Sequence, residues 1–295
     1  WQAVAKRLPD THRKEVVAAP SVLLPQARCV FVLAYPTYYA TGWTREQAVV
    51  SGYYFASQAA YRATEQLAVW LREKGVAAMA TASLPAKACA WRAGLGVYGR
   101  NTLLRVEPFG NALTLRTVVA DVPLLIHASP VEDEMEATER HCGSCMRCVR
   151  ACPTGALDGR GGLDVTRCLR AHMMSGLPIP EAFRVLMGTR LLGCEICQQV
   201  CPYNADAPTR PAENTAPFAL AGLLAAETRT AQTRKIGALI GHNEARPQRV
   251  LAQAALITGN VGDTDYIPLL EALRTHENPV ICDHAAWAIK QLKKR

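Results

Sequence analysis

The sequence lacks several features that define major classes of protein. Its 295 residues include no run of about 18 uncharged apolar residues, the length that a helix needs to cross a bilayer. No basic segment followed by an apolar one opens the sequence at Trp1, so we expect no secretory signal. Charged residues make up 20% and hydrophobic residues 49%, a composition typical of folded chains. We therefore expect a globular, cytoplasmic protein with no membrane partner.

Cysteine, in contrast, is concentrated in one segment. Eight of the 11 cysteines lie between Cys142 and Cys201, and the others are Cys29, Cys89 and Cys282. A disulfide scaffold would be a short, secreted chain with cysteines spread along it. The clustering predicts metal or iron–sulfur ligands and leaves the three scattered cysteines as packing residues.

The first run of cysteines has the spacing of a bacterial ferredoxin. It reads Cys142-x2-Cys145-x2-Cys148-x3-Cys152, followed by Pro153. In that pattern three closely spaced thiolates bind one [4Fe-4S] cubane, and the fourth binds a second cubane.

The second run, Cys194-x2-Cys197-x3-Cys201, is one ligand short, because Leu191 stands where the first cysteine of the pattern would be. Cys168 is the nearby cysteine that can replace it. Two zinc ions would also use eight cysteines, but zinc ribbons favour pairs of Cys-x2-Cys. We therefore predict two [4Fe-4S] clusters, one held by Cys142, Cys145, Cys148 and Cys201 and the other by Cys152, Cys168, Cys194 and Cys197.

Hydrophobic patterns along the chain predict an α+β fold. A buried strand is expected at 29–35, a helix at 56–73 and a strand at 112–120. Val250–Ile257 resembles Ile281–Ala288 at an offset of 31, which indicates HEAT-like paired helices or an ordinary helical cap. The expected parts are an α/β domain over 1–135, an acidic connector at 129–140, a double-cluster ferredoxin-like domain over 136–210, a linker at 207–217 and a helical domain over 211–295.

A Gly-x-Gly-x-x-Gly motif spans 94–99, with Asp121 at about the distance expected in a dinucleotide site. Its context is wrong, because 86–92 reads as helix rather than strand and Pro108 follows too soon for a crossover helix. We therefore expect no Rossmann site.

Several motifs resemble the epoxyqueuosine reductase family. They are Arg92-Ala-Gly-Leu-Gly-Val-Tyr-Gly-Arg-Asn-Thr-Leu-Leu104, Phe109-Gly110, Asp121-Val-Pro-Leu124, the cysteine runs with Cys152-Pro-Thr-Gly-Ala156, Arg190-Leu-Leu-Gly-Cys-Glu-Ile-Cys197, and His284-Ala-Ala-Trp-Ala288. The resemblance covers nearly the whole chain in the family's order, and Cys168 has a counterpart there.

The resemblance implies a nitroreductase-like domain that binds cobalamin beside the ferredoxin-like domain. Electrons from an external carrier of the flavodoxin or ferredoxin type would pass through the clusters to cobalt and reduce epoxyqueuosine in tRNA. By position, Arg100, Asn101 and Thr102 match the segment that lies against the cobalamin, and Cys194 and Glu195 also approach it.

One family feature is missing. The Asp that donates a proton to the substrate corresponds to Ala80, a frequent Glu corresponds to Ala86, and no acidic residue occurs from 74 to 106. A further family segment is degraded to Phe55-Ala-Ser-Gln-Ala59. Alanine cannot act as a general acid.

Three explanations for the missing acid stay open. Another residue could donate the proton, the candidates being Tyr98, Tyr53, Tyr54 and His172. The protein could reduce another substrate, as the related cobalamin-dependent dehalogenases do. It could also be a non-catalytic electron-transfer or tRNA-binding paralogue.

The net charge of +8 permits a polyanionic partner such as tRNA. The tail from 229 to 295 is only moderately basic, with ten Lys or Arg against six acids. Two oxidised clusters with their thiolates would reduce the net charge to about +4. Charge alone therefore supports tRNA binding less firmly than the resemblance does.

Overall fold

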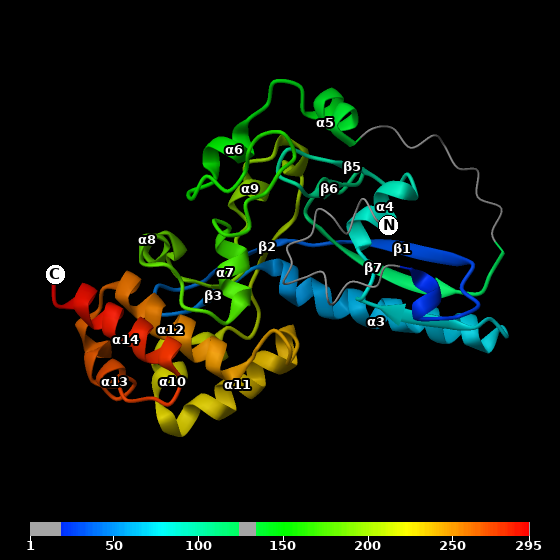
Figure 1. Ribbon diagram of the computed structural model, residues 1–295. Helices are drawn as coiled ribbons and strands as arrows, with labels where there is room; N and C mark the ends of the chain where they lie inside the picture. Colours follow the sequence, from blue (N-terminus) through cyan, green and yellow to red (C-terminus); the bar gives the residue numbers. More distant parts are fainter. Residues whose placement is uncertain (1–18, 124–133, 295) are drawn as a thin grey trace.

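The computed structural model describes residues 19–123 and 134–294 (Figure 1). The strands are β1 (Cys29–Pro36), β2 (Tyr39–Thr41), β3 (Val49–Val50), β4 (Ala78–Thr81), β5 (Val97–Tyr98), β6 (Leu104–Arg105), β7 (Leu113–Ala120), β8 (Arg190–Leu192) and β9 (Thr209–Pro211). The α-helices are α3 (Gly52–Glu73), α4 (Ala86–Arg92), α5 (Glu134–Cys142), α6 (Arg147–Ala151), α7 (Leu169–Ser175), α8 (Glu181–Arg184), α9 (Ile196–Gln199), α10 (Leu220–Leu224), α11 (Ala226–Ile240), α12 (Pro247–Val261), α13 (Ile267–Glu271) and α14 (Pro279–Leu292). Short 3-10 helices are η1 (Pro20–Val22), η2 (Val185–Met187), η3 (Pro202–Asn204), η4 (Ala216–Phe218) and η5 (Thr264–Tyr266).

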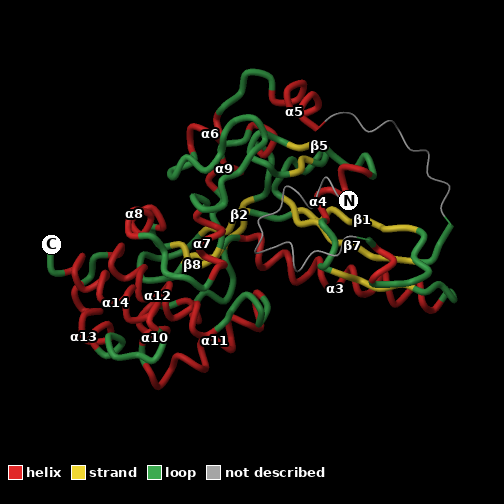
Figure 2. Tube along the Cα trace, viewed as in Figure 1, coloured by secondary structure: helices red, strands yellow, loops and turns green. Residues whose placement is uncertain are grey.

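An antiparallel sheet in the order β1-β7-β4 forms the centre of the N-terminal part (Figure 2). β7 lies between the other two strands, so Val118 and Val119 are fully buried. The strands predicted at 29–35 and 112–120 are confirmed. The expected burial of the first is wrong, since β1 is an edge strand in which only Cys29 is buried.

Helix α3 covers one face of this sheet (Figure 1). The Ser51 hydroxyl accepts a hydrogen bond from the Tyr53 amide at 3.1 Å and so caps the helix. The helix therefore begins at Gly52, before the predicted Ala56. Small residues such as Ala60 occupy its buried positions and allow close packing.

The Gly-x-Gly-x-x-Gly segment forms a hairpin in which β5 pairs antiparallel with β6. No helix separates this hairpin from β7. The segment therefore lacks the strand–turn–helix geometry of a dinucleotide site, and the exclusion of a Rossmann motif is confirmed.

Two short parallel pairs connect the N-terminal part to later segments. β2 pairs with β9 and β3 pairs with β8. The stretch 207–217 is therefore more than a linker, because β9 lies within it. The acidic connector is also partly wrong: 129–133 lies outside the described residues, and from Glu134 the chain forms α5.

The C-terminal part is helical, as predicted, and its two repeat-like segments lie on α12 and α14. These helices pack directly together (Figure 1). A Cβ at Gly259 would lie 2.9 Å from the Ala288 Cα atom, so glycine permits the close approach. No described helix is long and apolar enough to cross a membrane.

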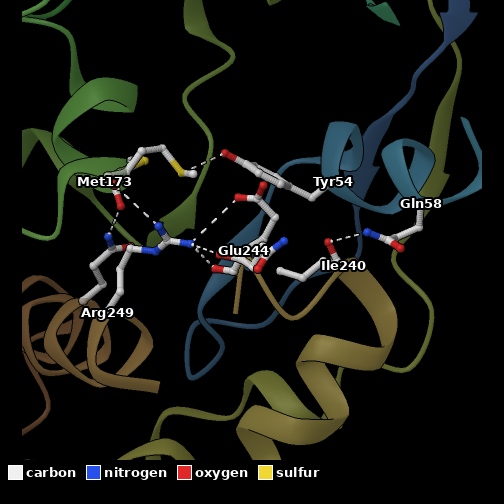
Figure 3. Close-up of polar contacts among 9 residues, drawn as sticks. Tyr54, Gln58, Met173, Ile240, Glu244 and Arg249 are labelled. Atoms are coloured by element: carbon white, nitrogen blue, oxygen red, sulfur yellow. Dashed lines mark hydrogen bonds and ion pairs between the residues drawn. The ribbon is translucent and has the colours of Figure 1, made fainter. Parts of the chain in front are cut away.

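Polar contacts join α3, α7 and the C-terminal helices (Figure 3). The Tyr54 hydroxyl donates to Met174 Sδ at 3.5 Å, and Gln58 Nε2 donates to the Ile240 carbonyl at 3.1 Å. Arg249 also donates to the Met174 carbonyl at 3.5 Å. These contacts connect α7, within the predicted cluster domain, to α3 on one side and to α12 on the other.

Candidate functional site

The first set of cysteines lies where α5, α6 and η3 meet and consists of Cys142, Cys145, Cys148 and Cys201. Cys142 ends α5, Cys148 lies on α6, and Cys201 precedes η3. Burial raises the pKa of Cys148, and the nearby thiols of Cys142 and Cys201 raise it further. Burial also raises the pKa of Cys201, which is close to Cys142 and Cys145. These four thiols can therefore face one common centre.

The second set gathers beside the first and consists of Cys152, Cys168, Cys194 and Cys197. Burial raises the pKa of Cys197 to about 12, with contributions from the other three members and from Cys148 of the first set. Burial likewise raises the pKa of Cys194, near Cys168 and Cys152. The structure thus brings all eight predicted ligands into two neighbouring groups.

The two neighbouring sets together supply eight thiols, the number of ligands that two cubanes require. In the described part of the chain, no group of three or more His, Cys, Asp or Glu side chains is arranged to hold a single metal ion. The assignment of individual ligands stays a prediction.

Cys152 receives hydrogen bonds that suit a thiolate. The Ala156 amide donates to Cys152 Sγ at 3.3 Å, and the Thr154 hydroxyl lies 3.6 Å away. Burial acts to raise the pKa of Cys152, but these contacts and further amides outweigh it and lower the pKa. Such donors stabilise negative charge on a cluster ligand.

Asn111 links the N-terminal domain to the first set. Its Nδ2 atom donates to Cys201 Sγ at 3.6 Å. Asn204 holds it on two sides, accepting from the Asn111 amide at 2.8 Å and donating to Asn111 Oδ1 at 2.7 Å. Gly110 has φ +60°, and a Cβ there would lie 2.2 Å from Asn204 Oδ1, so only glycine fits.

Arg105 places its guanidinium group beside the first set, and its Nε lies 3.5 Å from Glu107 Oε1. It is 8% exposed, and its guanidinium carbon lies 3.7 Å from the centre of the Tyr203 ring. Its Nη2 is 3.0 Å from His141 Nδ1, and the Tyr203 hydroxyl donates to the His141 carbonyl at 2.6 Å. The sequence reasoning missed Arg105 and Asn111, and its only hint was Phe109-Gly110 just before Asn111.

The residues expected at the cobalamin use their side chains within the protein. Arg100 donates to the carbonyl of Gly143 at 2.8 Å and to that of Gly159. Asn101 Nδ2 donates to the Cys197 carbonyl at 3.2 Å. The Glu195 carboxylate accepts from the Ser51 hydroxyl, and burial raises its pKa. These side chains attach the N-terminal domain to the cluster segment.

The backbone of the same turn is strained at Thr102. Thr102 has φ +62°, which a β-branched residue rarely adopts. Two hydrogen bonds maintain this conformation: the Thr102 amide donates to the Gly99 carbonyl at 2.8 Å, and Lys87 Nζ to the Thr102 carbonyl at 2.9 Å. Strain maintained in this way occurs at ligand sites, and here it lies at a position where the resemblance implies a cofactor.

Ala80 lies in β4, opposite Val118, and packs against the apolar cluster beneath α3. Leu71 and Ala78 belong to the same cluster. The position expected to carry a proton donor thus faces a hydrophobic layer.

The alternative proton donors are spread through the structure. Tyr98 lines a cavity against the first set and packs on Trp91, with ring centroids 6.4 Å apart. Tyr54 is 2% exposed, and burial raises its pKa. The Tyr53 hydroxyl lies 3.5 Å from Thr114 Oγ1, and His172 Nε2 lies 2.8 Å from the Thr166 carbonyl. Only Tyr98 borders the first set.

Comparisons with known proteins agree with this geometry. Residues 141–204 match the family described as "4Fe-4S double cluster binding domain". The epoxyqueuosine reductase of Bacillus subtilis strain 168 is 32% identical over 219 residues, covering 72% of this chain and 54% of that protein. The corresponding protein of Pseudomonas aeruginosa is 33% identical over 216 residues, covering 70% of this chain and 56% of that protein. A crystal structure of an epoxyqueuosine reductase with an epoxyqueuosine-modified tRNA stem loop has a TM-score of 0.73 and 26% identity, covering 99% of this chain and 80% of that one.

The fold and site thus define an α+β protein with a double [4Fe-4S] cluster domain. The chain is similar to epoxyqueuosine reductases over most of its length. It spans little more than half the length of the curated relatives that it matches.

Proposed function

We propose that this chain is an iron–sulfur oxidoreductase of the epoxyqueuosine reductase type. It would pass electrons through two [4Fe-4S] clusters to a cobalamin and reduce epoxyqueuosine in tRNA or a related substrate. The observation that carries the proposal is the convergence of eight cysteines into two neighbouring sets, within a chain similar to epoxyqueuosine reductases over most of its length.

The neighbouring positions of Cys148 and Cys197 support direct electron exchange between the clusters, because each belongs to a different predicted set. Asn101 would hold the second cluster's loop against the N-terminal domain through the Cys197 carbonyl. Arg100 would do the same for the first cluster's loop through Gly143.

A cobalamin would lie against the turn of Arg100, Asn101 and Thr102, with Glu195 nearby. When bound, it would supply a cobalt centre that accepts single electrons. The strained backbone at Thr102 supports this placement, and Arg100 and Asn101 would act by positioning the turn rather than by touching the corrin.

The substrate of the proposal is tRNA that carries epoxyqueuosine, since a similar structure holds such a stem loop. A tRNA substrate would place the enzyme in the cytoplasm. Tyr98 is the candidate proton donor that borders the first set. The electron donor would be a carrier of the flavodoxin or ferredoxin type. The proposed parts are a nitroreductase-like domain over 1–135, a ferredoxin-like domain over 136–210 and a HEAT-like domain over 211–295.

Anaerobic reconstitution tests the proposal in three steps. Iron and sulfide analysis should give about eight of each per chain, as two cubanes require. Titration with cobalamin, followed by absorbance, should then saturate at one equivalent. Turnover of an epoxyqueuosine-containing stem loop should follow reduction. Absence of any corrin binding would refute the cobalamin-dependent function.

A second function is favoured by the apolar setting of Ala80. Without the expected acid, the chain could be a non-catalytic electron relay or a tRNA-binding paralogue. Clusters without corrin binding would favour the relay, and stem-loop affinity without turnover would favour the binding protein. A reductase for a different substrate would bind cobalamin and leave the stem loop unchanged.

A further inference from the structure

An open basin lies over the first set of cysteines. Cys142 and Cys145 form part of its lining, together with Arg140, Arg147 and Arg150. The lining contains no cysteine of the second set. Of the two predicted clusters, the first is therefore the one that this basin makes accessible from solvent.

The basin is lined by arginines and by no Asp or Glu. Arg147 and Arg150 are exposed and lie three residues apart on α6, so they share a face of that helix. No Asp or Glu occurs between Arg140 and Leu157. A cubane with four thiolates carries a charge of about −2 by formal counting, and these arginines offset it. The rim can therefore attract an acidic surface that the bare cluster would repel.

Only small side chains cover the first set on the side of the basin. Gly143 and Ser144, which separate Cys142 from Cys145, are small and exposed. A Cβ at Gly143 would meet no atom within 4 Å, so the space outside the loop is open. The Arg100 guanidinium fixes the loop from behind through the Gly143 carbonyl at 2.8 Å. A redox group held by another protein can thus come close to the cluster at a rigid point.

We propose that this basin is the docking surface for an acidic one-electron carrier protein, which delivers electrons to the first cluster. The inference rests on the proposed function in requiring that the cluster be present. In the step itself the carrier loses one electron and the cluster core changes from [4Fe-4S]2+ to [4Fe-4S]1+. With a flavodoxin, the anionic flavin hydroquinone becomes the neutral semiquinone, and no proton leaves.

The position of the arginines favours a protein carrier over RNA as the occupant. Electron transfer slows steeply with distance, so an electron carrier gains from docking at a basin whose lining includes two predicted cluster ligands, Cys142 and Cys145. An RNA backbone would be attracted by the arginines but would gain nothing from closeness to the cluster. Small contact areas and electrostatic steering are also typical of transient electron-transfer complexes.

The test uses the reconstituted chain and reduced flavodoxin, with cluster bleaching followed by stopped flow. Charge reversal in Arg147→Glu/Arg150→Glu should lower the second-order rate about tenfold or more at low ionic strength and flatten its salt dependence. Arg234→Glu, at an exposed position on α11, changes charge without touching the basin and should have a much smaller effect. Arg150→Glu alone should give an intermediate rate.

Further measurements separate docking from other effects of these substitutions. Iron content and the dithionite-reduced EPR spectrum should match wild type, which separates docking from cluster loss. Ser144→Trp should slow reduction at saturating flavodoxin, because it thickens the layer over the cluster without changing charge. Unchanged flavodoxin rates in the charge-reversal variant would overturn the proposal. So would a loss of stem-loop affinity with normal flavodoxin rates, which would assign the basin to tRNA. Failure of the wild-type chain to bind iron would instead refute the proposed function.

Discussion

Asn111 Nδ2 lies 3.6 Å from Cys201 Sγ and is the side-chain hydrogen-bond donor to this predicted ligand of the first cluster. Asn111 precedes β7 in the N-terminal domain, whereas Cys201 lies 90 residues later. Asn204 secures the contact by bonding both the amide and the side-chain oxygen of Asn111. The environment of the first cluster is thus set in part by a domain that contributes none of its cysteines.

Removing this donor should lower the reduction potential of the first cluster. A hydrogen bond to sulfur stabilises the more negative, reduced cluster. Asn111→Asp removes that donor and adds a negative charge beside the sulfur, and both changes disfavour reduction, while an oxygen remains for Asn204. The lost hydrogen bond of about 0.5–1.5 kcal/mol alone corresponds to about 20–60 mV for one electron, and the added charge increases the shift. An EPR-monitored redox titration measures the shift, and the second cluster serves as the internal control. Equal shifts in both clusters would contradict the assignment of Cys201 to the first.

Gly110→Ala should destabilise the protein and impair iron loading. Alanine at this position would have to adopt φ +60°, which is strained for any residue with a Cβ. Its Cβ would also lie 2.2 Å from both Asn204 Oδ1 and the Tyr203 carbonyl oxygen. Gly75→Ala is the matched control, because Gly75 also has positive φ (+79°) but has nothing within 4 Å of a Cβ. The control should cost about 1–2 kcal/mol in free energy of unfolding, from backbone strain alone. Gly110→Ala should cost more in urea denaturation; equal costs would mean that the contact with η3 relaxes freely.

His284 should make stability depend on pH. It is 1% exposed; its Nε2 accepts from the Ile179 amide at 3.1 Å, and its Nδ1 donates to the Ala252 carbonyl at 2.9 Å. Burial lowers its pKa below the ordinary 6.5. As the pH falls, His284 is therefore protonated in the unfolded state before it is protonated in the folded state. The contribution of His284 to the free energy of unfolding is thus present above pH 6.5 and is lost as the pH falls through the lower, folded-state pKa.

Urea denaturation between pH 5 and 8, followed by tryptophan fluorescence, measures this effect. His284→Gln should be less stable than wild type at pH 8, and the difference should shrink toward pH 5. A constant difference over this range would show that His284 does not titrate on unfolding.

Ala80→Asp should destabilise the chain rather than restore a proton donor. Its carboxylate would enter the apolar cluster formed with Leu71 and Ala78, at a cost of about 1–3 kcal/mol. Ala82→Asp, at an exposed position two residues later, should be nearly neutral. Urea denaturation of both variants measures the loss of stability, and stem-loop turnover shows whether a proton donor has been restored. Increased turnover in Ala80→Asp would show that the missing acid limits the reaction.

Much of the site could be predicted from the sequence because its chemistry is local. Three ligands at x2 spacing come from one tight loop, so Cys142, Cys145 and Cys148 predict a cluster without any knowledge of the fold. The partners of that loop could not be predicted in the same way. Arg100 matched a cofactor-binding segment, yet its guanidinium holds the Gly143 carbonyl, since packing of the two domains decides which groups it meets.

The same division holds for the fold. Alternating and 3.6-residue patterns predicted β1, β7 and the C-terminal helices, because those patterns reflect which side of an element is buried. They could not predict that β9 pairs with β2 or that β1 lies at a sheet edge, since strand partners far apart in sequence leave no periodic signal. By itself the sequence predicted which cysteines act as ligands, because their spacing is local. Only the tertiary structure decided that Asn111 and Arg105 would lie against the first set of cysteines, because those contacts depend on how separately folded segments pack together.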